Sequence, residues 1–204
     1  MAQSHVDTEV VPSDRTPPKG TRSTNTRAHI LDAAEEFVLE HGGRELTLEQ
    51  VAKAAGLSKG GVLYHFPTKT ALLQTMLARL LDYVEAEFQA GVGDTTPQDR
   101  LMAYTHVSLH ANEKDKRLGA ALLAVLAEDP KLLEPLRTFY RKRFAELRSL
   151  GPHFGRATVI LLAVEGLFML ELLGLSDLSS QERGTLEWAL RALVDAEAPG
   201  GNDA

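Results

Sequence analysis

The segment from Thr47 to Lys69 constrains the fold most, because two short helical patterns stand on either side of a glycine turn. It reads TLEQVAKAAGLSKGGVLYHFPTK. Thr47 and Gln50 have the spacing of a capping box that begins the first helix, and Ser58 is placed to cap the second. Gly56 suits the left-handed conformation that ends a helix and turns the chain sharply. The segment therefore predicts two short helices joined by a tight turn.

The rest of the chain follows the period of amphipathic helices and shows no alternating pattern of useful strand length. One helix is expected at about 26–41, and a long one is expected after Thr68, up to Gly91. The remaining helices are expected at about 98–112, 117–128, 130–150, 155–173 and 180–196. Pro135 should kink its helix or mark the first turn, and Ser179 with Glu182 forms a second capping-box pattern.

These patterns predict an all-α fold in which a three-helix helix-turn-helix domain precedes a larger C-terminal helical bundle. Residues 1–23 combine prolines with polar residues and are expected to form a disordered arm. That arm is either a solvated tail or a basic extension that reaches nucleic acid. The helix-turn-helix domain is placed at 24–70, the bundle at 71–196 and a frayed tail at 197–204.

Composition excludes several classes of protein. The 204 residues include no cysteine, which excludes disulfides, thiolate zinc fingers and a catalytic thiol. The longest apolar stretch, 158–175, contains Glu165 and Glu171 and is marginally short for a membrane span. No phosphate-binding loop, dinucleotide fingerprint or serine nucleophile motif occurs. We therefore expect a cytoplasmic protein that is not an enzyme, uses no cofactor and has no membrane partner.

Charge is distributed unevenly along the chain. The formal net charge of −6 at pH 7 argues against a nucleic-acid partner, but no acidic residue lies between Glu49 and Asp82. That window contains Lys53, Lys59, His65, Lys69 and Arg79. The helix-turn-helix and the start of the next helix should therefore present a local cationic surface.

A helix that reads a major groove needs a positive end that can approach the bases closely. Lys59, Gly60 and Gly61 meet that need, since glycine has no side chain to hold the backbone away. We expect a base contact from Lys59, a base or phosphate contact from Ser58, and a thymine-methyl contact from Leu63. Contacts to phosphate are expected from Thr47, Tyr64, His65 and Lys69. Taken singly, each of these residues has an ordinary structural explanation, such as a loose helix start or a solvated lysine.

The run from Thr47 to Lys69, followed by Ala71-Leu72-Leu73, resembles the N-terminal domain of the tetracycline-repressor (TetR) family of bacterial transcriptional regulators. The resemblance covers about residues 25–75. It implies a homodimer, usually a repressor, that binds a palindromic operator in double-stranded DNA. A small molecule bound by the C-terminal domain would release the DNA. By position, the family's DNA contacts fall on Thr47, Ser58, Lys59, Gly61, Tyr64, His65 and Lys69.

The chain departs from the family at two positions of the reading helix. Many members carry Tyr where this chain has Leu63, and Thr or Asn where it has Gly61. The family's base preference therefore does not carry over to this chain.

The C-terminal region should hold a dimer interface, because the segment at 158–175 is apolar nearly all round and both its faces need cover. A two-fold dimer would set the two reading helices one DNA turn, about 34 Å, apart. The residues expected at the interface are Leu161, Leu172, Leu186, Trp188, Leu190 and Leu193.

An excess of Leu, Phe and Met in the same region suggests a mostly apolar small-molecule ligand. The residues expected to bind it are Tyr104, His106, His110, Phe139, Glu165, Phe168 and Met169. Glu165 is costly to bury unpaired, so it faces a pocket, lies at its rim or pairs with an arginine. His106 and His110 have a spacing that can bind metal, but no third ligand is near in the sequence, so no metal site is expected.

A second function class stays open from the sequence: a helical protein-interaction module without ligand control. Affinity for DNA falls steeply with salt when phosphates are neutralised by cationic side chains. An interaction module would show no such dependence, so salt titration separates the two.

Overall fold

The computed structural model describes residues 19–90, 96–128 and 130–195. Over these ranges the chain forms nine α-helices and two short 3₁₀ helices, with no strand, so the predicted all-α fold is confirmed. The elements are α1 (Lys19–His41), α2 (Leu48–Ala54), α3 (Lys59–His65), α4 (Lys69–Ala90), α5 (Pro97–Leu109), α6 (Glu113–Leu126), η1 (Pro130–Leu133), α7 (Glu134–Arg148), η2 (Gly151–His153), α8 (Phe154–Leu172) and α9 (Ser180–Asp195).

Helix α1 begins at Lys19, earlier than the sequence predicted, so residues 19–23 of the expected arm belong to a helix. Residues 1–18 and the expected tail at 197–204 lie outside the described residues.

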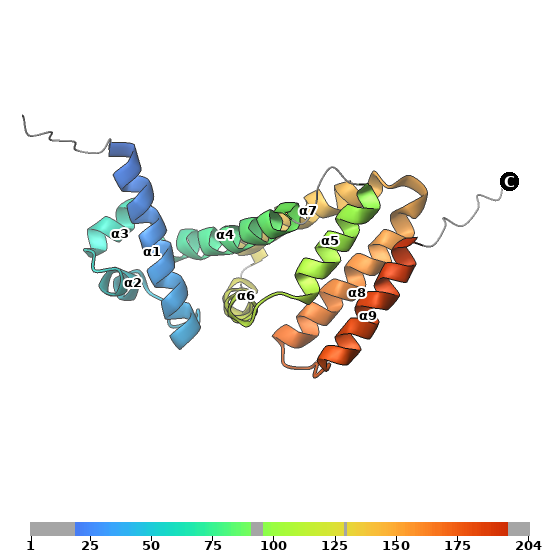
Figure 1. Ribbon diagram of the computed structural model, residues 1–204. Coiled ribbons are helices and arrows are strands. Elements are labelled where there is room, and N and C mark those ends of the chain that lie inside the picture. Colours follow the sequence, from blue (N-terminus) through green and yellow to red (C-terminus); the bar gives the residue numbers. More distant parts are fainter. Residues whose placement is uncertain (1–18, 91–95, 129, 196–204) are drawn as a thin grey trace, which may run out of the picture.

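The helices form two groups joined by α4 (Figure 1). Helices α1, α2 and α3 pack together at one end, and α4 runs from them toward a bundle that contains α5, α7, α8 and α9. Helix α6 lies between the groups and contacts α1, α4 and α8. This position makes α6 a direct mechanical link between the two ends of the molecule.

Each group has its own hydrophobic core. The first core includes Ile30, Val51, Phe66 and Leu72, together with Leu118 and Leu122 from α6. The second core is built around Phe88, Tyr104, Ile160, Val164 and Leu190. Because α6 is part of the first core, a displacement of α6 disturbs the packing of the N-terminal helices.

Local signals position α2 and α3 largely as the sequence predicted. The Gln50 amide donates to Thr47 Oγ1 over 3.2 Å, and the Gly61 amide donates to Ser58 Oγ over 3.1 Å. Gly56 has φ +64°, the left-handed conformation expected at the turn. The Thr47 box is only half formed, because the Gln50 side chain accepts from the Thr47 hydroxyl rather than from its amide.

The structure also tests the capping box at Ser179 and the position of Pro135. The Ser179 amide donates to Glu182 Oε2 and the Glu182 amide donates to Ser179 Oγ, so this capping box is complete. Pro135 lies in the first turn of α7 and does not kink it. Among the helices of the described ranges, none combines the length and the apolar character needed to cross a membrane.

Candidate functional site

Helix α3 presents one face to the core and the other to solvent. Val62 and Phe66 are buried and anchor the helix, at 0% and 1% exposure. On the opposite side, Tyr64 is 81% exposed and Leu63 is 38% exposed. Burying such apolar side chains is normally favourable, so an exposed tyrosine on a short helix is suited to contact with another molecule.

The N-terminal end of α3 is free of steric obstruction. A Cβ atom added to Gly60 would meet only Ser58 Oγ, at 4.0 Å, and one added to Gly61 would meet the same atom at 3.4 Å. Neither glycine has a positive φ. The packing of the chain itself therefore does not require glycine at Gly60, whereas close approach of an external backbone or base edge would.

Lys59 is held by an acidic neighbour across the turn. Its Nζ lies 2.5 Å from Glu49 Oε1, and both side chains are largely exposed. The hydrogen bond and the charge of Lys59 lower the pKa of the Glu49 carboxyl. Solvent weakens such an exposed pair, so a stronger acceptor such as a DNA base or phosphate can displace Glu49.

The expected phosphate contacts lie around α3 at different depths. Thr47 is exposed at the start of α2, while His65 is half-buried and stands edge-on to the Tyr64 ring at 5.1 Å. Lys69 Nζ donates to the Arg44 carbonyl over 2.9 Å, so this lysine stabilises the loop before α2. Lys69 must break this hydrogen bond before its ammonium group can contact a phosphate.

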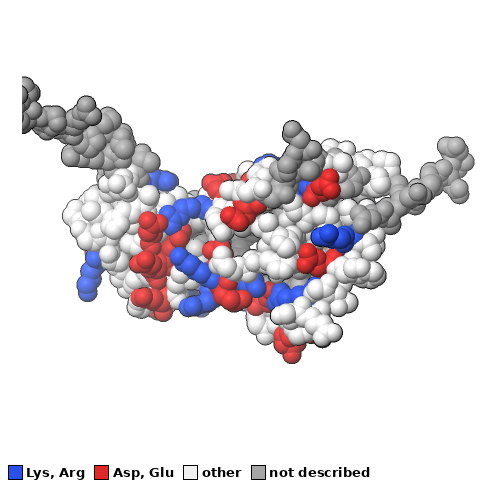
Figure 2. All heavy atoms as spheres, viewed as in Figure 1, with Lys and Arg blue, Asp and Glu red and all other residues white. Residues whose placement is uncertain are grey.

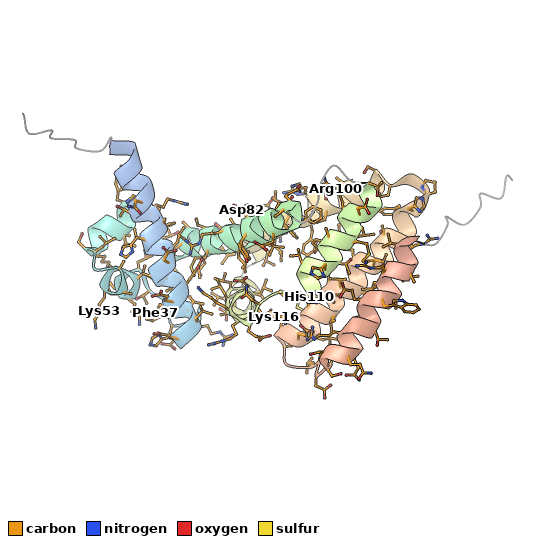
Figure 3. The ribbon with its side chains drawn as sticks, in the orientation of Figure 1. Phe37, Lys53, Asp82, Arg100, His110 and Lys116 are labelled. Carbon is orange, nitrogen blue, oxygen red and sulfur yellow. The ribbon has the colours of Figure 1, made fainter. Side chains whose placement is uncertain are left out.

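The cationic surface is smaller than the sequence predicted. Arg79 lies 2.7 Å from Asp32 and 2.5 Å from Glu35, both on α1. Burial opposes its charge, but the two carboxylates outweigh that effect and raise the pKa of Arg79. Figure 2 shows acidic side chains along α1 with basic side chains beside them. Arg79 is thus neutralised, whereas Lys53 projects from α2 into solvent (Figure 3).

In the C-terminal bundle, Glu165 accepts hydrogen bonds from two tyrosines. Tyr104 donates to Glu165 Oε1, and Tyr140 donates to Oε2 over 2.6 Å. Burial, followed by the charge of Glu165, raises the pKa of both hydroxyl groups. Of the alternatives for Glu165, the structure shows pairing inside the bundle. Its partners are two tyrosines and not the expected arginine.

Arg143 is buried at the centre of the same region, with 4% exposure. Its guanidinium lies over the rings of Phe88 and Tyr104, at 4.4 and 4.7 Å. Nη2 lies 2.5 Å from Glu85 and Nη1 lies 3.0 Å from Glu146. The cation–π contacts and the two carboxylates together offset the free-energy cost of removing the Arg143 charge from water.

Two hollows adjoin this network. The smaller, about 210 Å³, is lined by residues that include Phe88, Arg100, Tyr104, Arg143 and Leu161. The larger and more open, about 470 Å³, runs along α7 past Tyr140, with Leu136 and Phe144 as apolar lining. The smaller hollow combines apolar lining with a few polar groups, which is typical of small-molecule sites. The larger hollow is also lined by charged residues, which are Glu134, Arg137, Arg141 and Arg148.

The structure brings together only part of the expected ligand site. Tyr104 and Phe139 lie against Arg143, Glu165 accepts a hydrogen bond from Tyr104, and Phe168 is half-buried on α8. Met169 is exposed on α8, away from this network. His106 and His110 are exposed and pair with Glu187 of α9 outside both hollows. His106, His110 and Met169 therefore lie apart from the network around Arg143 and do not line either hollow.

The expected dimer residues also divide. Leu161 and Leu190 are buried in the chain's own core, at 2% and 3% exposure, so neither is available to a second chain. Leu172 and Leu186 are half-buried. Trp188 and Leu193 are exposed, at 71% and 40%. The sequence predicted a partner-facing side for segment 158–175 but did not name the exposed apolar residues there, which are Val159, Leu162, Met169 and Leu170 of α8 and Leu173 at its C-terminal cap.

Comparison with known proteins agrees with this architecture. Residues 30–76 match the bacterial regulatory proteins of the tetR family, and residues 98–195 match the tetracyclin repressor-like C-terminal domain. The chain is similar to the HTH-type transcriptional regulator RutR of Escherichia coli, with 32% identity over 108 residues, which is 52% of this chain and 51% of RutR. It is also similar to SrpR of Pseudomonas putida, with 38% identity over 68 residues, which is 33% of this chain and 32% of SrpR.

The chain thus spans between a third and about half of the length of these curated relatives. A solved structure from Rhodococcus sp., assigned to the TetR family of transcriptional regulators, shares the fold with a TM-score of 0.68 at 22% identity. That likeness covers 83% of this chain and 98% of the other.

Proposed function

Because the chain belongs to the TetR family of helix-turn-helix transcriptional regulators, we propose that it acts as a homodimeric repressor of a palindromic operator. The observation that carries this proposal is the solvent-facing side of α3: an exposed lysine and two sterically free glycines begin the helix, and an exposed tyrosine lies in its last turn. A helix with this end suits insertion into the major groove.

Dimer formation is supported by the uncovered apolar face of α8 and α9. Leu162 is 58% exposed, Leu173 63% and Trp188 71%. Apolar side chains this exposed on two neighbouring helices indicate an interaction surface, and a second copy of the same surface would cover them by two-fold symmetry. Such a dimer presents two α3 helices to one palindrome.

Release by a small, mostly apolar molecule is supported by the hollows of the C-terminal bundle and by the position of α6. A ligand beside Tyr104 and Arg143 lies within the second core, which α8 helps to form. Helix α6 contacts α8 and also contributes Leu118 and Leu122 to the first core. Movement of α6 is thus a physical route from the ligand to α1, α2 and α3.

Salt titration of DNA binding tests this function. We expect the chain to bind a fragment from its own gene's upstream region, with log affinity falling linearly as log salt rises. A helical protein-interaction module would instead show no salt-dependent affinity for DNA. No binding to upstream fragments even at low salt overturns the proposed regulator.

A thermal-shift screen tests the effector. An apolar compound that raises the melting temperature and also weakens DNA binding supports it, since ligands that bind the folded state stabilise it. If no compound of a broad apolar set does both, the proposed ligand class is wrong.

A further inference from the structure

Two histidines of α5 and one glutamate of α9 converge on the outer surface of the C-terminal bundle. His106 Nδ1 lies 3.1 Å from Glu187 Oε1, and His110 Nε2 lies 3.9 Å from Glu187 Oε2. One potential ligand atom from each residue lies within 4.8 Å of the other two. The glutamate is 81 residues from His106 in the sequence, so the sequence pattern alone could not supply this third group.

The two imidazole rings lie against each other. They stack with centroids 4.2 Å apart and an angle of 29° between their planes. His110 lies at the C-terminal cap of α5, and Figure 3 shows it at the opposite end of that helix from Arg100. Both histidines are exposed while Glu187 is half-buried, so the cluster is open to an ion from solvent.

A hydrogen bond orients the second ring. His110 Nδ1 lies 2.9 Å from the His106 carbonyl oxygen, which can only accept. In the neutral ring the hydrogen is therefore on Nδ1, which leaves a free lone pair on Nε2, 3.9 Å from Glu187 Oε2. Histidines that bind metals are commonly held in this way, by donating the other ring nitrogen to a carbonyl or carboxylate.

An ion pair with Glu187 explains the position of His106 but not that of His110. The His106 contact with Glu187 is within hydrogen-bonding distance, but 3.9 Å is too long for His110. In a tetrahedral zinc site, nitrogen and oxygen ligands about 2.0–2.2 Å from the ion are separated from each other by about 3.3 Å. The two histidines approach different oxygens of Glu187, at 3.1 and 3.9 Å, and the three ligand atoms lie within 4.8 Å of one another, so small side-chain movements would bring them to this spacing.

We propose that His106, His110 and Glu187 form a binding site for a divalent transition-metal ion. Two imidazole nitrogens and one carboxylate suit Zn²⁺ and its first-row neighbours, whereas Mg²⁺ and Ca²⁺ prefer all-oxygen sites. A fourth position stays open to water or a small anion. Arg191, whose guanidinium is 4.0 Å from Glu187, is 61% exposed and can turn away into solvent. The bound ion joins the end of α5 to α9.

Zinc titration of the full chain, prepared without a polyhistidine tag and freed of metal by a chelator, tests this site. Competition with a zinc-responsive chromophore should give about one tight Zn²⁺ site per chain, insensitive to excess Mg²⁺ or Ca²⁺. His106→Ala, His110→Ala and Glu187→Gln should each weaken binding at least about tenfold, since losing even an outer partner of a ligand costs that much.

Matched controls keep the result specific. His153→Ala removes an imidazole from η2, outside the cluster, and should leave zinc affinity unchanged. Zn²⁺ should also raise the melting temperature of the wild-type chain and of His153→Ala, but not of the three cluster variants. Trp188, the single tryptophan, adjoins Glu187 in the sequence. Ni²⁺ should therefore quench its fluorescence in the wild-type chain and in His153→Ala, but not in the three cluster variants.

Unchanged zinc affinity in His106→Ala and His110→Ala overturns the proposal, as does an equal loss in His153→Ala. Because both histidines are exposed, their alanine variants should fold, and unfolding curves without metal verify the folding of all three variants. The outcome is independent of whether the chain binds DNA.

Discussion

Single residues at the exposed end of α3 decide how closely this chain can approach a base pair. Lys59 carries the charge but is held 2.5 Å from Glu49. Gly60 keeps the approach open, with no atom nearer than 4.0 Å to a Cβ placed there. Charge and clearance are separate properties, and each can be changed without the other.

Removing the carboxylate of Glu49 should strengthen DNA binding. In Glu49→Gln, Lys59 loses its charged partner and is free for an acceptor on DNA, so we expect affinity to rise about three- to tenfold at low salt. Fluorescence anisotropy with a labelled duplex measures this. Glu45→Gln removes the same charge from an exposed residue that is no partner of Lys59. An equal gain in that control would show that net charge, and not release of Lys59, is responsible.

A methyl group at Gly60 should separate folding from DNA binding. Gly60→Ala meets no close atom in the chain, and alanine in place of a helical glycine is worth about 0.5–1 kcal/mol. We expect an equal or higher unfolding free energy in urea, together with at least about a tenfold loss of operator affinity, roughly 1.4 kcal/mol. Gly184→Ala, equally unobstructed on α9, should leave operator affinity intact. Full affinity in Gly60→Ala would contradict close approach at this position.

Among the helices, α4 and α7 are joined by charged groups within the second core. Glu85 of α4 lies 2.5 Å from buried Arg143 and 2.7 Å from Lys142, both on α7. Burial alone would favour the neutral acid, but hydrogen bonds from Lys142 and Gln89 and the charge of Arg143 outweigh it and lower the pKa of Glu85. The carboxylate therefore stabilises the packing of the two helices.

Glu85→Gln should lower the unfolding free energy by about 2 kcal/mol, because hydrogen bonds to charged groups are worth about 1.5–3 kcal/mol. The contribution of Glu85 is complete above its ordinary pKa of 4.5 and is lost as pH falls through the lower pKa of the folded chain. The difference between wild type and variant should therefore narrow below about pH 4.5. Urea unfolding across pH measures it, with exposed Glu87→Gln as the control. A difference that persists unchanged at low pH would contradict this role.

The sequence predicts elements well where the determining contact is local. The bonds from Gln50 to Thr47, from Gly61 to Ser58 and from Glu182 to Ser179 all span three residues. Helix type and the turn at Gly56 follow from such contacts, so the helix-turn-helix was found nearly in full. The start of α1 was missed, since the polar residues after Lys19 carry no apolar periodicity.

Contacts between distant residues were out of reach of the same reasoning. Tyr140 and Glu165 are 25 residues apart, and Glu85 and Arg143 are 58 apart. In a one-dimensional pattern, Arg143 reads as a solvated residue of a polar helix, although its guanidinium is buried among aromatic rings. The sequence therefore could not show which side chains of the C-terminal bundle the fold brings together.

At the scale of the whole molecule, the described residues of α8 and α9 include apolar side chains that no other described element covers. Leu162 is 58% exposed, so Leu162→Glu should leave the chain folded. It should disrupt the proposed dimer, because the two-fold interface would have to bury a glutamate from each chain. Analytical ultracentrifugation should show a monomer, and operator affinity should fall at least tenfold, roughly 1.4 kcal/mol. Tyr83→Glu, 46% exposed on α4, should remain dimeric. A Leu162→Glu chain that is still a dimer would place the interface elsewhere.

The measurement that most directly tests how this regulator contacts DNA compares Lys59→Ala with Lys69→Ala on an operator and on a random duplex. If α3 enters the major groove, Lys59→Ala should reduce the ratio of specific to random affinity at least tenfold, since a base contact is worth about 1–3 kcal/mol of discrimination. Lys69→Ala should weaken both affinities alike and lower the salt slope by about one. Equal losses on operator and random DNA for Lys59→Ala would show that the end of α3 does not read bases.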